Sequence, residues 1–195
     1  MIVDNHYIKN ELLKVGISIN GIYDLVNTGI PYPEAIPILI EIVDKKFDDI
    51  RIQEGVVRAL TVKEAIGKAN ATLLSLYNAT SKDKSLFRWA IGNAFNTIII
   101  KDDVEEILRI IQDKTNEESR QMFVLALGKI KPKQAEDILI DLLDDDDVVA
   151  HAISTLGRMK SQRAREKILL LTSHSKTFIR NSAKAALKKI DRDRA

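Results

Sequence analysis

The side chains best suited to recognition lie on one face of an expected helix in this 195-residue sequence. Trp89, Asn93 and Asn96 stand at i, i+4 and i+7, a spacing that brings them onto a single helix face. Trp89 is the only tryptophan, and aromatic anchors of this kind dominate the binding energy of many protein interfaces. These residues therefore predict a patch that binds a protein or a peptide. The alternative is that Trp89 packs between neighbouring helices while both asparagines face water.

Other expected helices carry candidate binding residues at equivalent positions. They are Arg58, Met122, Leu125, His151, Ser154 and Arg158. Together with Trp89 they form a mixed apolar, amide and guanidinium surface, which suits a peptide or the surface of another protein. Each residue alone fits an ordinary exposed helix position, so the prediction depends on their joint placement.

Basic residues follow the ends of several expected helices. The set comprises Lys129, Lys131, Lys133, Arg158, Lys160, Arg163, Arg165, Lys188 and Lys189. The helix dipole stabilises cations at helix C-termini, which explains many of them without any ligand. A second hypothesis is that one edge of the protein contacts a phosphate backbone through Lys129, Lys131, Lys133, Lys160 and Arg163. The formal net charge of +2 does not predict a nucleic-acid binder, although it allows a local basic strip.

The sequence lacks the usual arrangements for catalysis and metal binding. It has no cysteine, which excludes disulfides, thiolate nucleophiles and cysteine zinc sites, and its three histidines are scattered. The four carboxylates of 144–147 could attract Ca²⁺, but they lack the glycine turn and the distal glutamate of a calcium loop. We expect them, like the carboxylates within 102–106, to cap helix N-termini. The sequence therefore predicts a non-enzymatic protein without a metal ion or another cofactor.

The elements that must position these side chains recur along the chain. A helical segment recurs at a spacing of roughly 31 residues. We call the first residue of each copy its anchor, and the anchors are Gln53, Arg88, Arg120, Val149 and Arg180. In each copy an apolar residue lies three positions after the anchor, and a small residue six positions after it is followed by Leu or Phe. These offsets define one face of an α-helix, and the small residue lets two helix backbones approach closely.

Two glycines lie near the ends of these segments. Gly128 and Gly157 stand eight positions after their anchors. We expect each to end its helix, because glycine tolerates the positive φ that a helix C-terminus often requires.

Each of these segments follows another helical pattern, so the sequence predicts helical hairpins. Polar stretches as short as 144–147 connect the two helices, and connections of this length force antiparallel neighbours. The expected repeats are 33–63, 67–98, 103–130, 134–159 and 163–190, after a capping hairpin at 1–30. The predicted fold is all-α, a right-handed superhelical solenoid of about five to six hairpins with twelve helices, in a single domain over 1–195.

The segments 119–128 and 179–187, in which an arginine precedes Ala-Leu by six residues, resemble HEAT repeats. More narrowly, they are similar to the HEAT-like repeats of the phycobilisome-lyase type, over roughly residues 33–190. The resemblance implies a solenoid whose second helices line a concave groove that holds a partner. Gln53 and Val149 replace the family's anchor arginine and so interrupt any ladder of Arg–Asp pairs between repeats. Enzymatic relatives with such repeats imply two alternatives, a bilin-lyase-like accessory subunit and a DNA-glycosylase-like nucleic-acid binder.

The N-terminal segment lacks a basic region followed by an apolar stretch, so we expect no signal peptide. No apolar run approaches the roughly 18–20 residues of a membrane span, and we expect a cytoplasmic protein. The leading hypothesis is a scaffold or adaptor that binds another protein or a peptide in the groove around Trp89. Nucleic-acid binding by the basic edge stays open, as does the oligomeric state.

Overall fold

The computed structural model describes residues 2–193, and in this part of the chain every regular element is a helix. Between residues 2 and 193, twelve α-helices are joined by short turns and stretches of 3-10 helix, and the only β-type contact is an isolated bridge between Val3 and Phe47. The predicted all-α class is therefore confirmed. The backbone contacts divide the chain into a first unit that ends at Ile98 and a second unit that begins at Ile99.

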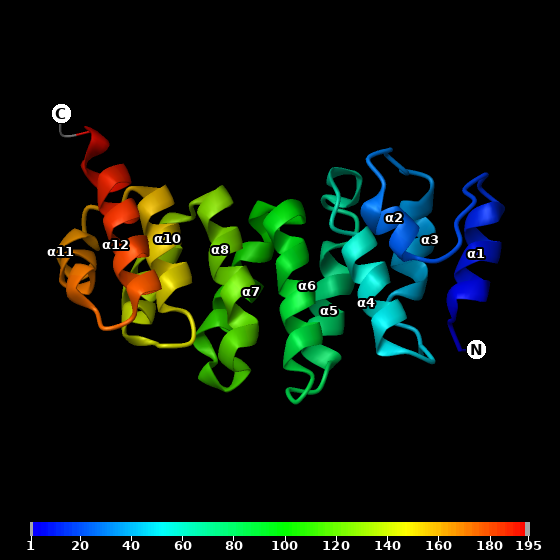
Figure 1. Cartoon of the computed structure of the whole chain (residues 1–195), viewed down its shortest axis with the longest axis horizontal. Helices are drawn as coiled ribbons and strands as arrows, with labels where there is room; N and C mark the ends of the chain where they lie inside the picture. The colour runs from blue at the N-terminus through cyan, green and yellow to red at the C-terminus, as the bar shows by residue number, and fades with distance from the viewer. Residues whose placement is uncertain (1, 194–195) are drawn as a thin grey trace. The chain divides into compact units, whose positions relative to one another are not determined.

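The first unit contains three helix pairs, coloured blue to green in Figure 1. The pairs are α1 (Asn5–Leu13) with α2 (Tyr23–Asn27), α3 (Ala35–Ile42) with α4 (Ile50–Ala59), and α5 (Asn70–Ala79) with α6 (Ser85–Ile98). The second helices α4 and α6 pack against one another. Each pair falls within one of the residue ranges expected for the capping hairpin and the first two repeats.

The second unit also contains three helix pairs, coloured green to red in Figure 1. They are α7 (Val104–Gln112) with α8 (Gln121–Ile130), α9 (Glu136–Asp141) with α10 (Val149–Met159), and α11 (Arg165–Leu170) with α12 (Thr177–Ile190). Here too the second helices pack in series, α8 against α10 and α10 against α12. The expectation of one continuous domain over 1–195 stays a prediction.

The small residue of each repeat is buried, and two of the five make contacts between second helices. Ala59, Ala94, Ala126, Thr155 and Ala186 are all buried. The Thr155 hydroxyl donates a hydrogen bond across the helix interface to the Val124 carbonyl at 2.8 Å. The predicted close approach is confirmed at Thr155 and at Ala186, which lies against Gly157 of the preceding second helix. The one polar member of the set is satisfied by the neighbouring helix.

The prediction that Gly128 and Gly157 end their helices is wrong. Helix α8 continues to Ile130 and α10 to Met159, and the left-handed residues that follow are Lys131 (φ 52°) and Lys160 (φ 57°). The glycines serve packing instead. A Cβ on Gly157 would lie 2.8 Å from the Ala186 Cβ, and one on Gly128 would lie 2.9 Å from the Arg158 Cδ. Both glycines therefore let α10 approach its neighbours closely.

The anchor residue of three repeats clamps its hairpin by donating to backbone carbonyls at or just beyond the end of the first helix. Arg120 is fully buried and donates to the Ile111 carbonyl at 3.2 Å and the Glu117 carbonyl at 2.9 Å. Gln53 does the same with its amide, at 2.9 Å from the Val43 carbonyl. Arg180 reaches two carbonyls of the turn before α12. The last carbonyls of a helix have no partner within it, so this clamp satisfies groups that would otherwise stay unpaired.

The expected helix-capping role of carboxylates 144–147 is wrong. The residue that caps α10 is Val148, whose side chain makes no capping bond. The four carboxylates form ion pairs with the preceding and following repeats: Asp145 and Asp147 with Arg120, Asp144 with Lys167, and Asp146 with Lys176. The Arg–Asp ladder implied by the resemblance therefore exists at this step. The capping expected of 102–106 does occur, because the Asp103 carboxylate accepts the Ile100 N–H at 2.8 Å.

Candidate protein-binding surface

The residues predicted to bind a partner all lie on second helices and are all partly exposed. In the first unit Arg58 lies on α4, and Trp89, Asn93 and Asn96 lie on α6. The opposite face of α6 is buried, so the three α6 residues form the boundary between the core and the solvent. Arg58 pairs with Glu54 one turn earlier on α4, at 2.6 Å, so its charge is already balanced.

The second unit brings the other predicted residues together on two helices that pack against each other. Met122 and Leu125 lie on α8, and His151, Ser154 and Arg158 lie on α10. The Arg158 Nη1 donates to the Leu125 carbonyl at 3.4 Å, so this side chain extends across to α8. We call the partly exposed positions on α8, α10 and α12 the second-helix surface of the second unit.

His151 differs from an ordinary surface histidine. Its Nδ1 atom is buried and has no hydrogen-bond partner among the described residues. Burial lowers the pKa of the imidazole, because the charged form is poorly solvated there. His151 therefore presents a neutral, largely apolar ring at pH 7, next to the apolar and hydroxyl side chains of this surface.

Acidic residues are segregated between the two kinds of helix in the second unit. The second helices contain no aspartate or glutamate, and their basic residues are Lys129, Arg158, Arg180, Lys184, Lys188 and Lys189. The first helices carry both signs, the acids Glu105, Glu106, Glu136, Asp137, Asp141 and Glu166 and the bases Arg109, Arg165 and Lys167. The sequence reasoning missed this segregation, although a comparison of the charge of alternate helices would have found it.

The five cations expected to contact phosphate are all exposed, but their surroundings differ. Within residues 2–193 no ion pair involves Lys129, Lys131 or Lys133. Lys131 also lines an open pocket of about 280 Å³ together with Lys101 and apolar side chains. Arg163, by contrast, is paired with Asp137 at 2.5 Å and Glu136 at 3.4 Å. These pairs weaken the case for a continuous phosphate-binding edge.

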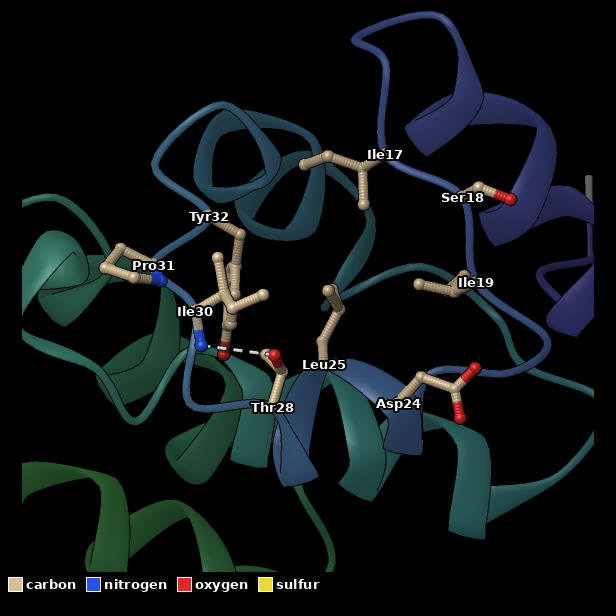
Figure 2. Close-up of a pocket in the computed structure, with 9 residues that line it drawn as sticks. All are labelled: Ile17, Ser18, Ile19, Asp24, Leu25, Thr28, Ile30, Pro31 and Tyr32. Carbon is tan, nitrogen blue, oxygen red and sulfur yellow. Dashed lines mark hydrogen bonds between the residues drawn. The ribbon is translucent and has the colours of Figure 1, made fainter.

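A surface pocket in the first unit was not predicted from the sequence. Its volume is about 280 Å³, and it is lined by Ile17, Ser18, Ile19, Asp24, Leu25, Thr28, Ile30, Pro31 and Tyr32. Figure 2 shows Ile17, Ile19 and Leu25 facing the loop that carries Ile30 and Tyr32. A second pocket of about 260 Å³ shares Ile30 and Tyr32, and the Ile30 side chain is 74% exposed.

Tyr32 holds this loop against the core of the first unit. Its hydroxyl donates to the Ala59 carbonyl at the end of α4, at 2.8 Å. Burial, with a smaller contribution from the Glu64 charge, raises the pKa of Tyr32 to about 12. The phenol therefore stays protonated and remains a donor, so the pocket wall is apolar and structurally fixed on this side.

The helix pairs and their repeat register define an all-α, HEAT-like solenoid fold class. In agreement with this, the family model for HEAT repeats matches residues 104–188, which lie within the second unit. The match supports a HEAT-repeat protein in general and does not show the phycobilisome-lyase type. No curated protein sequence matches the chain.

In the part of the chain that the structure describes, every helix is too short or too polar to span a bilayer. Between residues 2 and 193, no three or more His, Asp or Glu side chains are grouped so that they could hold a metal ion.

Proposed function

We propose that this chain is a non-enzymatic scaffold or adaptor that binds a protein or peptide on its second helices. HEAT repeats commonly mediate interactions between proteins, and the fold is typically non-catalytic. The observation that carries the proposal is that the candidate residues on α4, α6, α8 and α10 are without exception partly exposed. Such positions can bury further surface when a partner binds, without disturbing the core.

The side chains at these positions support recognition of a protein in preference to a small molecule. Trp89 with Asn93 and Asn96 combines a large aromatic surface with amide donors and acceptors on a rigid helix. Met122 and Leu125 add apolar area, and Arg158 adds a guanidinium group. Arginine, methionine and tryptophan are enriched in the centres of protein interfaces.

Site-specific photo-crosslinking tests the proposal directly. A photoreactive amino acid is placed at Asn93 on the second helix α6 or, as the control, at Ala71 on the exposed side of the first helix α5. In the cell that naturally makes the chain, we expect discrete crosslinked protein bands from position 93 and none of these bands from position 71. Identical crosslinking patterns from both positions would contradict the proposal.

A pair of alanine variants on α6 separates recognition from general hydrophobic adhesion. Trp89→Ala removes the proposed anchor, while Leu86→Ala removes a side chain that is 83% exposed on the same helix. Truncation of an interface anchor costs about 2 kcal/mol or more, so the crosslinked bands from position 93 should fade only with Trp89→Ala. Equal effects of both substitutions would count against a specific site.

A further inference from the structure

We infer that the second-helix surface of the second unit binds an acidic, extended peptide segment through a row of three cations. This row, called the cation row below, consists of Lys129 on α8, Arg158 on α10 and Lys189 on α12. The inference rests on the proposed protein-binding function and names the chemistry of the partner.

The cation row follows from the repeat register. Its three members stand nine positions after the anchors Arg120, Val149 and Arg180, near the C-terminal end of each helix. Because α8, α10 and α12 pack in series, equivalent positions lie side by side across the helices. The contact of Arg158 with the backbone of α8 confirms this placement for the first two members, since its Cδ lies against Gly128, the residue before Lys129.

The charge of the row is available to a partner. Lys129 and Lys189 are exposed, Arg158 is partly exposed, and none of the three forms an ion pair with another residue of 2–193. Because α8, α10 and α12 contain no carboxylate, nothing on these helices competes for the cations. The helix dipole places further partial negative charge beside each cation, but three adjacent helices still present net positive charge along this line.

The spacing of the row matches an extended chain. Packed helix axes lie about 8–10 Å apart. An extended peptide in the polyproline II conformation turns once every three residues and advances about 3.1 Å per residue, so its every third side chain faces the same side about 9 Å further on. One acidic side chain at every third residue would therefore meet one cation on each helix. Leu125 and Ser154 lie one turn before Lys129 and Arg158, so a small or apolar residue between the acids would contact them.

The neighbours of the row favour a peptide over single-stranded nucleic acid. Proteins that hold single strands combine cations with aromatic side chains on which the bases stack. The side chains beside the row are Leu125, Ser154 and Ala185, none of them aromatic. The aromatic rings at the surface of these helices lie away from the row: Phe178 is at the opposite end of α12, and the partly exposed His151 is two turns before Arg158 on α10.

Fluorescence polarisation with two synthetic peptides tests the inference on the full chain. The probe peptide carries aspartate at every third position with leucine and alanine between, and the control isomer has the same composition with all aspartates clustered at one end. We expect the spaced probe to bind about tenfold or more tightly than the isomer, because only the spaced acids meet all three cations. We also expect its affinity to fall steeply as salt is raised.

Charge-reversal variants locate the binding. Lys129→Glu and Lys189→Glu should each weaken the spaced probe about tenfold or more, since each both removes an attraction and adds a repulsion. The matched control is Lys68→Glu, which makes the same charge change at an exposed lysine of the first unit. Lys129→Gln keeps the size and removes only the charge, and thermal melting verifies that each variant is folded.

The outcomes separate the inference from the function on which it rests. Equal binding of both peptides, no binding of either, or no loss with Lys129→Glu and Lys189→Glu overturns the inference. A thymidine oligonucleotide that displaces the probe, and whose own binding is lost in the same variants, assigns the row to nucleic acid and also overturns it. If the peptides fail while position 93 still crosslinks specific proteins, only the acidic-peptide inference is lost.

Discussion

The two units of this chain connect their helices through different kinds of side-chain interaction. In the second unit, successive repeats are joined by ion pairs that converge on residues 144–147, with Arg120 buried at their centre. In the first unit a side-chain hydrogen bond between successive hairpins comes from a neutral group, the Tyr23 hydroxyl, which donates to the Arg51 carbonyl at 3.2 Å. Neutral side chains also close the hairpin of α3 and α4, where Gln53 donates to the Val43 carbonyl and Tyr32 to the Ala59 carbonyl. The HEAT-repeat match falls within the second unit.

The comparison shows that equivalent repeat positions in the two units carry a side-chain hydrogen-bond donor, although the type of side chain can differ. At the anchor, Arg120 and Gln53 both satisfy a carbonyl at the end of the preceding helix. At the far end of the hairpin, Asn70 donates to the Ile98 carbonyl and Gln162 to the Ile190 carbonyl, each at 2.9 Å. The last carbonyls of a helix lack a hydrogen-bond partner within it, and any side-chain donor long enough to reach them can supply one.

Removal of Arg120 should have the largest effect and would show how far the second unit depends on its ion pairs. Arg120→Ala leaves Asp145 and several carbonyls without their partner in a buried site, and we expect a loss of about 3–5 kcal/mol in the free energy of unfolding. Gln53→Ala should cost only about 1–2 kcal/mol, because a single neutral hydrogen bond is lost.

Urea denaturation of the full chain measures both variants, with hydrogen exchange to assign each loss to a unit. The control is Arg51→Ala, which removes an exposed arginine paired with Asp49 and should change stability little. Similar losses for Arg120→Ala and Gln53→Ala would break the proposed contrast between the units.

Acid should weaken the second unit through Asp145. Burial would raise the pKa of this carboxyl, but hydrogen bonding and charge from Arg120, together with the Asp147 N–H, hold it below its usual range. A lowered folded-state pKa means that the stabilisation is present above the unfolded-state value of about 3.9 and is lost as pH falls through the lower folded-state pKa.

Asp145→Asn should therefore cost about 2 kcal/mol at pH 7 and reduce the pH dependence of unfolding below about pH 4. Denaturation series at several pH values measure this. An unchanged pH dependence in Asp145→Asn would show that another carboxylate is responsible.

Alanine substitutions at the two packing glycines should have effects of intermediate size on stability, with a net loss at Gly157 and little change at Gly128. Gly157→Ala places a Cβ within 2.8 Å of the Ala186 Cβ and 2.9 Å of its Cα, so backbone must move. Overpacking of about 1–3 kcal/mol exceeds the roughly 1 kcal/mol that alanine gains in a helix, and we expect a net loss. Gly128→Ala meets the flexible Arg158 side chain, which can shift, so we expect little change in the midpoint of thermal melting. A greater loss at Gly128 would contradict this account.

The smallest expected effects come from left-handed residues and have opposite signs in the two units. Lys131 and Lys160 adopt positive φ in the second unit, where the first unit uses Gly16 and Gly67. Lys131→Gly should stabilise by about 0.5–1 kcal/mol, and Gly67→Ala should destabilise by a similar amount, although a Cβ there would meet no atom within 4 Å. Differential scanning calorimetry of both variants measures this, with Lys133→Gly as the control. The same sign for both changes would refute the backbone explanation.

Local periodicity made the fold predictable. The spacing of apolar and small residues placed each helix pair in the correct range, and the small residues Ala59, Ala94 and Ala126 that it singled out are buried. The partial exposure of the predicted binding residues is observed, but their role in binding stays a prediction. The roles of Gly128, Gly157 and residues 144–147 were misread, since helix ends and helix contacts favour the same residue types.

The sequence by itself determined the all-α repeat architecture, the helix count and the register of the second helices, because a helix of period 3.6 leaves its pattern in neighbouring residues. Only the tertiary structure decided which donor closes each hairpin, why Gly157 must lack a side chain, and where the loop at Ile30 opens a pocket. The bonds of Tyr32 to Ala59, Asn70 to Ile98 and Arg120 to Asp145 join groups about 25–30 residues apart, whose meeting follows from how hairpins pack and not from any local preference. The absence of acidic residues from α8, α10 and α12 can be read from the sequence. These helices became a candidate partner surface only because the structure shows that they pack in series.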